Sequence, residues 1–144
     1  MNGSSNLLDQ PVNKKCKSCG KNVAASHNVY CSIKCQQTYQ YRKYIDMWFL
    51  GEVSGGKSGG KYVSNYVRRW LFDKFDSKCQ RCGWSEVNPA SGLVPLDVHH
   101  IDGDSSNSAP SNVELLCPNC HSLTATYGNL NKGNGRSSKK NTGS

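Results

Sequence analysis

Two stretches of the chain carry apolar residues at helical spacing. From Ser32 to about Leu50 the sequence places large side chains on one helical face. These are Tyr41, Tyr44, Ile45, Trp48 and Phe49. A second stripe over residues 62–75 has apolar side chains at i, i+3, i+4, i+7 and i+8, namely Val63, Tyr66, Val67, Trp70 and Leu71. The pattern therefore predicts two amphipathic helices.

Two short apolar runs further along have the length of strands. Residues 93–99 form the first, residues 113–117 the second, and the loop between them is rich in turn residues. Asp102 and Asp104 are interpreted as turn-forming residues of that loop. A helix is expected to open at His121, so the order strand, strand, helix predicts a ββα unit. The fold class is therefore α+β.

The segment GEVSGGKSGGK, residues 51–61, has five glycines and two serines and predicts a flexible linker. It divides the chain into residues 1–50, with a first helix, and residues 62–128; residues 129–144 are expected to be a basic flexible tail. Gly51 and Gly56-Lys57-Ser58 formally match the P-loop pattern. That motif works only between a buried strand and a helix, so we expect no nucleotide cofactor.

The composition limits the size of the core. Leu, Ile, Val and Phe number 26 of 144 residues, and the formal net charge is +8. Such a chain needs a staple such as a metal or disulfides. The longest apolar run is only residues 47–50, so no membrane partner is expected. The start, MNGSSNLLDQ, has no secretion signal, which predicts a cytoplasmic protein in a reducing environment.

The eight cysteines form four close pairs, and a gap of two or three residues lets both sulfurs face one ion. Sequential pairing predicts two structural zinc sites. The residues of the first are Cys16, Cys19, Cys31 and Cys35, and those of the second are Cys79, Cys82, Cys117 and Cys120. A disulfide framework would require an oxidising compartment, so zinc is the favoured interpretation.

Charge is unevenly distributed along the chain. Residues 1–78 carry 13 basic and 5 acidic side chains, whereas residues 79–128 carry one basic and five acidic ones. The basic first half favours a nucleic-acid partner. Arg42 and Lys43, on the exposed side of the first helix, and Arg68 and Arg69, on the second, are the candidate DNA contacts.

The segment LDVHHIDGDSSNSAPSNVELLCPNCHSLTATYG resembles the HNH nuclease family. The resemblance rests on the tandem His99-His100, on Asn112 nine residues before His121, and on the CPNCH junction, and it covers residues 66–127. The segment WFLGEVSGG and what precedes it are similar to small free-standing HNH proteins of phage type. The resemblance implies a ββα-metal nuclease module, and the bacterial host cell as location if the protein is phage-encoded.

Hydrolysis of a phosphodiester needs a deprotonated water and positive charge near the phosphate. His100, with an ordinary pKa near neutrality, can accept the proton of water, while His99 and His121 can hold a divalent ion. Two protein ligands suit Mg²⁺ or Mn²⁺. The family roles imply the same assignment, with Asn112 fastening the loop between the strands. Some family members have a further histidine where this chain has Ala125.

The predicted activity is a DNA endonuclease that leaves 5′-phosphate and 3′-hydroxyl ends on double-stranded DNA. The alternative is a zinc-ribbon protein that binds DNA or RNA without cutting it. His27 is interpreted as an ordinary surface or core residue. The sequence leaves open whether the protein is a monomer or a homodimer, whether it nicks or breaks DNA, and which target it recognises.

Overall fold

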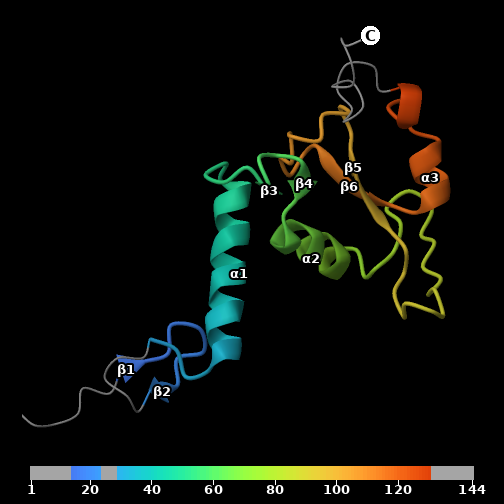
Figure 1. Cartoon of the computed structure of the whole chain (residues 1–144). Coiled ribbons are helices and arrows are strands. Elements are labelled where there is room, and N and C mark those ends of the chain that lie inside the picture. Colours follow the sequence, from blue (N-terminus) through green and yellow to red (C-terminus); the bar gives the residue numbers. More distant parts are fainter. Residues whose placement is uncertain (1–13, 24–28, 131–144) are drawn as a thin grey trace, which may run out of the picture. The chain divides into compact units, whose positions relative to one another are not determined.

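The computed structural model describes residues 14–23 and 29–130 (Figure 1). Packing divides the chain into two compact units, residues 1–43 and 44–144. The division falls inside the first helix, α1 (Ile33–Phe49), rather than after residue 50 as predicted. His27 and residues 131–144 of the predicted tail 129–144 lie outside the described residues.

The first unit contains a short hairpin and the start of α1. Strands β1 (Lys14–Lys15) and β2 (Asn22–Val23) pair antiparallel. Between them the Cys16 amide donates to the Lys21 carbonyl at 2.8 Å, and the Gly20 amide donates to the Cys16 carbonyl at 2.9 Å. These bonds curl the chain around the first cysteine pair. Helix α1 begins where Ser32 Oγ accepts a hydrogen bond from the Cys35 amide at 3.1 Å, which satisfies an amide of the first turn.

The last turns of α1 belong to the second unit, where they join an aromatic cluster. The Trp48 ring centroid lies 5.5 Å from that of Trp70 and 5.0 Å from that of Phe49. Ile45 and Trp48 are buried, whereas Phe49 is about half exposed. The predicted helical face is therefore confirmed at Ile45 and Trp48, and Phe49 lies at its margin.

Residues 51–61, whose composition predicts a flexible linker, contain part of a β-hairpin. Strands β3 (Gly56–Lys57) and β4 (Tyr62–Val63) pair antiparallel within and just after this segment. Gly55 has a φ of +79°, and a Cβ there would lie 2.4 Å from Trp48 Nε1 and 2.7 Å from the Ser108 carbonyl oxygen. This glycine is therefore a packing requirement, since any side chain would separate the hairpin from the core.

Helix α2 (Asn65–Lys74) begins three residues later than predicted. Ser64 Oγ accepts a hydrogen bond from the Val67 amide at 3.2 Å and caps the helix. Val63, expected on the helical stripe, lies in β4 instead. Val67 and Leu71 are fully buried, so the centre of the predicted stripe is confirmed.

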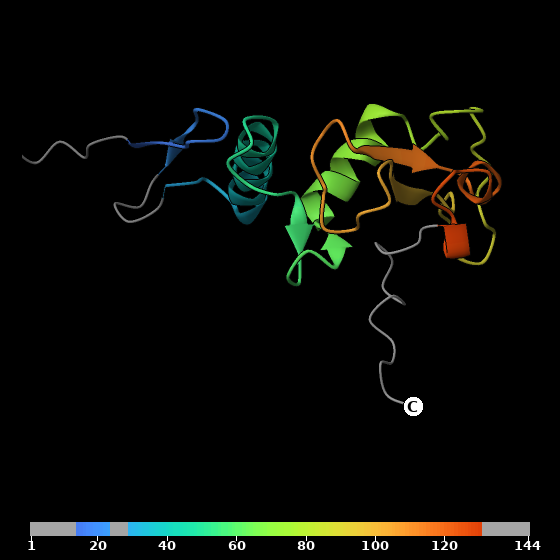
Figure 2. The ribbon, with the colours of Figure 1, turned by 90° about the horizontal axis from the view of Figure 1, so that it is seen from above.

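The C-terminal part of the second unit has the predicted order of strand, strand and helix. Strand β5 (Asp97–His100) pairs antiparallel with β6 (Val113–Leu116), and α3 (Pro118–Ser122) follows. Figures 1 and 2 both show α3 beside the strand pair, and α3 packs on both strands. The short 3-10 helix η2 (Gly128–Leu130) ends the described chain.

Strand β5 and helix α3 both begin at residues other than those predicted from the sequence. Strand β5 starts at Asp97 rather than at residue 93, because Pro95 has no amide hydrogen and the Leu96 amide turns back to the Val94 carbonyl at 2.9 Å. Helix α3 starts at Pro118, where proline is favoured as a first helical residue, so His121 lies near the end of α3 instead of at its start.

The core of the second unit lies where β6 packs against α2. Leu96, Leu115 and Leu116 are each at most 1% exposed there. None of the helices in the described residues is long and apolar enough to cross a bilayer.

Candidate active site

The last four cysteines of the chain converge beside the ββα unit. The Sγ atoms of Cys79, Cys82, Cys117 and Cys120 lie within 4.8 Å of one another, and none of the four is in a disulfide. Cys82 Sγ is 3.7 Å from Cys117 Sγ, far longer than the roughly 2.05 Å of a disulfide. Zinc–sulfur bonds of about 2.3 Å would put tetrahedral sulfurs about 3.8 Å apart. The group can therefore hold a zinc ion.

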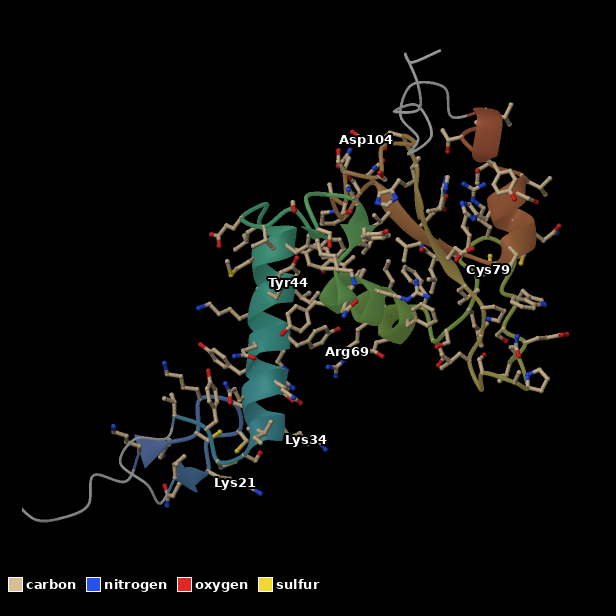
Figure 3. The ribbon with its side chains drawn as sticks, in the orientation of Figure 1. Lys21, Lys34, Tyr44, Arg69, Cys79 and Asp104 are labelled. Carbon is tan, nitrogen blue, oxygen red and sulfur yellow. The ribbon has the colours of Figure 1, made fainter. Side chains whose placement is uncertain are left out.

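Local turns make this convergence possible. The Gly83 amide donates to the Cys79 carbonyl at 2.9 Å, and Gly83 has a φ of +77°, so the chain folds back between Cys79 and Cys82. At the other half-site, Cys117 is the N-cap of α3 and its Sγ accepts a hydrogen bond from the Cys120 amide at 3.4 Å. Cys79 is labelled in Figure 3. In each of these two pairs, a tight turn of the backbone thus brings together the two cysteines that the sequence spaces three positions apart.

The thiols of this group cannot all ionise at neutral pH without a cation. Burial raises the pKa of Cys79, but the backbone amides of Cys117, Cys82 and Arg81 outweigh it and bring the pKa to about 6. The hydrogen bond with Cys82 and burial raise the pKa of Cys120 to about 12. A divalent cation would remove this conflict, because it stabilises every thiolate that it contacts.

The first unit holds an equivalent group of four cysteines, Cys16, Cys19, Cys31 and Cys35, whose Sγ atoms also lie within 4.8 Å of one another. The Sγ of Cys31 is 3.5 Å from that of Cys19 and 3.4 Å from that of Cys35. Hydrogen bonds with Cys35 and then Cys19 raise the pKa of Cys31 to about 12. This group also can hold a zinc ion.

His99 and His121 meet between β5 and α3. Their ring centroids are 5.3 Å apart, with the rings in an edge-to-face arrangement. His99 is 5% exposed, and burial, followed by the nearby His121, lowers its pKa below the ordinary value. The ring is thus kept neutral, which is the form that binds a metal. The distance suits two ligands of one cation, and the neutral ring of His99 suits its role as one of them.

Each of these two histidines has a carboxylate beside it. Asp97 Oδ2 lies 3.5 Å from His121 Nδ1, and Glu114 Oε1 lies 4.0 Å from His99 Nε2. Glu114 is opposite His99 in the strand register and is also paired with Arg81. Carboxylates in this position orient imidazole ligands and increase their basicity. Neither acid was predicted as a site residue. Asp97 lies two residues before His99 in the sequence, and this spacing could have indicated it. Glu114 could be found only from the pairing register of β5 and β6.

His100 is held by the loop that joins the two strands. Its Nε2 lies 3.1 Å from Ser108 Oγ, and Ser108 is 1% exposed. The Ser108 carbonyl in turn accepts a hydrogen bond from Trp48 Nε1 at 2.7 Å. A residue of α1 thus fixes the loop serine that contacts His100. Neither Trp48 nor Ser108 has a sequence signal for this role, because 60 residues separate them.

Asn112 fastens the same loop from inside. Its Oδ1 accepts a hydrogen bond from the Asp102 amide at 3.0 Å, and its Nδ2 donates to Asp102 Oδ1 at 2.8 Å and to the Asn107 carbonyl at 2.7 Å. Hydrogen bonds from the side chains of Asn107 and Asn112 lower the pKa of Asp102. Asp102 and Asp104 also accept backbone hydrogen bonds within the turn, which confirms their predicted role as turn formers.

The predicted DNA contacts fall in both units. Arg42 and Lys43 are exposed on α1 in the first unit. In the second, Arg69 pairs with Asp73 at 3.6 Å, whereas Arg68 donates to the Leu96 carbonyl at 3.2 Å. Figure 3 labels Arg69 on α2. The four basic residues therefore do not form one site within either unit.

A groove of about 440 Å³ runs beside β5 and carries His100 and His121 on its wall. The β3–β4 hairpin and α2 also contribute to its lining. The full lining is Lys57, Lys61, Tyr62, Val63, Asn65, Arg68, Asp97, Val98, His100, Ser105 and His121. Lys57 and Lys61 were missed as candidate site residues, because the glycine-rich segment was interpreted as a linker.

Comparison with known proteins agrees with this geometry. The family model for the HNH endonuclease matches residues 79–125, which include β5, β6 and α3. The H-N-H endonuclease F-TflIV of Escherichia phage T5 is 41% identical over an alignment of 59 residues, which covers 39% of this chain and 24% of that relative. The chain therefore spans about a quarter of the relative's length. No solved structure matches it. Residues 79–125 of the chain are therefore similar to an HNH endonuclease domain.

Proposed function

We propose that the protein is a DNA endonuclease that hydrolyses phosphodiester bonds with one catalytic divalent ion. The observation that carries the proposal is the convergence of His99 and His121, at 5.3 Å between ring centroids, beside a groove whose wall also includes His100. The match to the HNH endonuclease family supports a nuclease. Double-stranded DNA in a bacterial host cytoplasm is the proposed setting.

In this proposal His100 removes a proton from the attacking water. Its contact with Ser108 keeps the imidazole in a fixed orientation toward the groove. The water oxygen forms a bond to phosphorus and the bond from phosphorus to the 3′ oxygen breaks. The 3′ oxygen leaves with the bonding electron pair and takes a proton from solvent water, while His100 later returns its proton to solvent. The products are a 5′-phosphate end and a 3′-hydroxyl end.

His99 and His121 would hold the catalytic ion, Mg²⁺ or Mn²⁺. The fit rests on the donor set: the His99 ring is kept neutral by burial, and two imidazoles leave the remaining positions of the ion for oxygen ligands. When bound, the ion supplies positive charge to the phosphate oxygens. Asp97 and Glu114 would orient the two rings.

The two four-cysteine groups would bind structural zinc. Zinc bound by the two cysteine pairs would join the Cys79–Cys82 turn to the start of α3, where Cys117 and Cys120 lie. Helix α3 also carries His121, so the zinc would help to fix the position of that histidine. In small units of this kind the free energy of zinc binding is largely folding free energy. The zinc group of the first unit and the basic residues Arg42 and Lys43, together with Arg68 and Arg69, would contact the DNA backbone.

The test is the cleavage of supercoiled plasmid by the purified chain with Mg²⁺, Mn²⁺ or Ca²⁺, and without added ion. We expect nicked product with Mg²⁺ or Mn²⁺, and DNA ligase should reseal it, because ligase needs a 5′-phosphate beside a 3′-hydroxyl. A matched preparation of His99→Ala, with unchanged zinc content, should not nick the plasmid. If the natural sequence binds DNA but gives no ion-dependent nicking, a zinc-dependent binding protein is the better account.

A further inference from the structure

The groove that carries His100 and His121 also has a basic lining. Lys57, Lys61 and Arg68 line the groove, against one carboxylate, Asp97. Lys57 and Lys61 are exposed and belong to the hairpin β3–β4 and its turn. Three cations around a groove next to the proposed reacting group favour an anionic occupant with repeated charges.

The hairpin that carries the lysines is fixed rather than loose. The Ser64 amide donates to the Gly55 carbonyl at 2.8 Å, and Lys57 Nζ donates to Asn65 Oδ1 at 2.8 Å. At the hairpin turn, a Cβ on Gly60 would lie 3.1 Å from the Ser106 Cβ, so the turn packs closely on the loop between β5 and β6. The lysines thus have a defined position relative to that loop.

The same loop positions His100. Ser108, whose Oγ contacts His100 Nε2, also has its carbonyl close to Gly55, at the base of the hairpin. The hairpin and the imidazole are therefore built on a common support. An anion bound by the hairpin would stand at a fixed distance from His100, which is what a substrate-positioning element needs.

We propose that Lys57 and Lys61 bind the phosphates that flank the scissile bond, so that the β3–β4 hairpin positions the cleaved DNA strand in the groove. This inference rests on the proposed function. Lysine ammonium groups bind phosphate as mobile point charges, which suits successive phosphates along a strand. Lys57 can exchange its hydrogen bond with Asn65 for a phosphate oxygen, since its side chain is exposed.

The test compares lysines inside and outside the groove at equal change of charge. The groove variants are Lys57→Gln, Lys61→Gln and their double variant; the controls are Lys74→Gln and Lys78→Gln, exposed residues of the same unit. Binding of a fluorescently labelled duplex is measured by anisotropy over a range of NaCl concentrations, without added divalent ion. Zinc content and circular dichroism verify that each variant folds.

We expect the slope of log K against log[NaCl] to become less steep by about 0.9 for each groove lysine removed, and by about twice that in the double variant. The control substitutions should leave the slope at the value of the natural sequence. Lys57→Arg and Lys61→Arg keep the charge and should keep the slope. In cleavage assays the groove variants should raise KM for DNA more than the controls do.

Equal slopes for the groove and control variants would overturn the inference, even if the protein cleaves DNA. Displacement of the duplex by ATP at matched ionic strength would also overturn it, because the groove would then be a site for free nucleotides. A change of slope confined to the groove lysines, together with cleavage, would support the inference. The same change without any cleavage would show that the groove lysines bind the DNA backbone and that the proposed nuclease function fails, so there would be no scissile bond for them to flank.

Discussion

Replacing Asn112 with aspartate changes one atom of a buried side chain and should release the loop that holds His100. The substitution removes the two hydrogen bonds that Asn112 Nδ2 donates, to Asp102 Oδ1 at 2.8 Å and to the Asn107 carbonyl at 2.7 Å. It also puts a second carboxylate beside that of Asp102. The size of the side chain is unchanged, so the effect reports hydrogen bonding and charge rather than packing.

The expected loss of stability follows from these two bonds. A neutral hydrogen bond contributes about 0.5–1.5 kcal/mol net and one to a charged group about 1.5–3 kcal/mol, so the variant should lose about 2–4 kcal/mol near neutral pH. Repulsion between the carboxylates adds to this, weakened by solvent because Asp102 is exposed. For a unit of this size each kcal/mol lowers Tm by roughly 4–8 °C.

The pH dependence of unfolding measures how much of the stability loss comes from the added negative charge of Asn112→Asp. In Asn112→Asp, one carboxyl of the pair should have a folded-state pKa above its unfolded value of about 3.9. Its protonated form is tolerated in the folded state, so the variant should be closest to the natural sequence at low pH and fall further behind as pH rises through the raised pKa. In the natural sequence the pKa of Asp102 is lowered, so its contribution is lost only as pH falls.

The assay is thermal or urea unfolding of Asn112→Asp and the natural sequence between pH 5 and 8, compared at each pH so that zinc affinity cancels. Asn107→Asp is the matched control, because Asn107 Nδ2 also donates to Asp102, at Oδ2, but its side chain is exposed. We expect a smaller loss there. Equal losses for the two variants, or no dependence on pH for Asn112→Asp, would refute the reasoning.

Three further outcomes are expected. Trp48→Phe leaves the buried Ser108 carbonyl without its 2.7 Å donor and should cost about 1–3 kcal/mol in urea unfolding, whereas Trp70→Phe keeps that bond and should cost less. Ser108→Ala removes the contact with His100 and should slow DNA cleavage roughly tenfold with unchanged DNA affinity in anisotropy; an unchanged rate would contradict the role given to Ser108. Cys82→Ser should lower the zinc content from two ions to one per chain in native mass spectrometry and abolish cooperative unfolding of the second unit.

Features set by local spacing were predictable from the sequence. Two-residue gaps such as Cys79 to Cys82 fix which sulfurs can converge, and the structure brings together both sets of four cysteines that sequential pairing predicts. The apolar stripe that includes Trp48 likewise located α1 to within one residue at each end. The turn within each cysteine pair and the helical stripe were predictable because the residues involved lie a few positions apart. The joining of Cys82 to Cys117, 35 residues away, followed only from pairing the half-sites in sequence order.

Features that depend on distant contacts were not predictable. The glycines of residues 51–61 indicated a linker, but Gly55 is required by Trp48 and by Ser108, which is 53 residues away. The pairing of Glu114 with His99 depends on a strand register that the sequence does not specify. Lys57 therefore could not be assigned to the groove until the hairpin was placed beside β5.

The most direct test of the proposed nuclease site is the single-turnover rate of DNA cleavage by His100→Ala, at the same fraction of bound DNA as the natural sequence and with both zinc ions retained. A general base contributes roughly 10²–10⁴-fold, so the rate should fall at least about a hundredfold. A rate within about threefold of the natural sequence would contradict the role of His100 and, with it, the proposed mechanism.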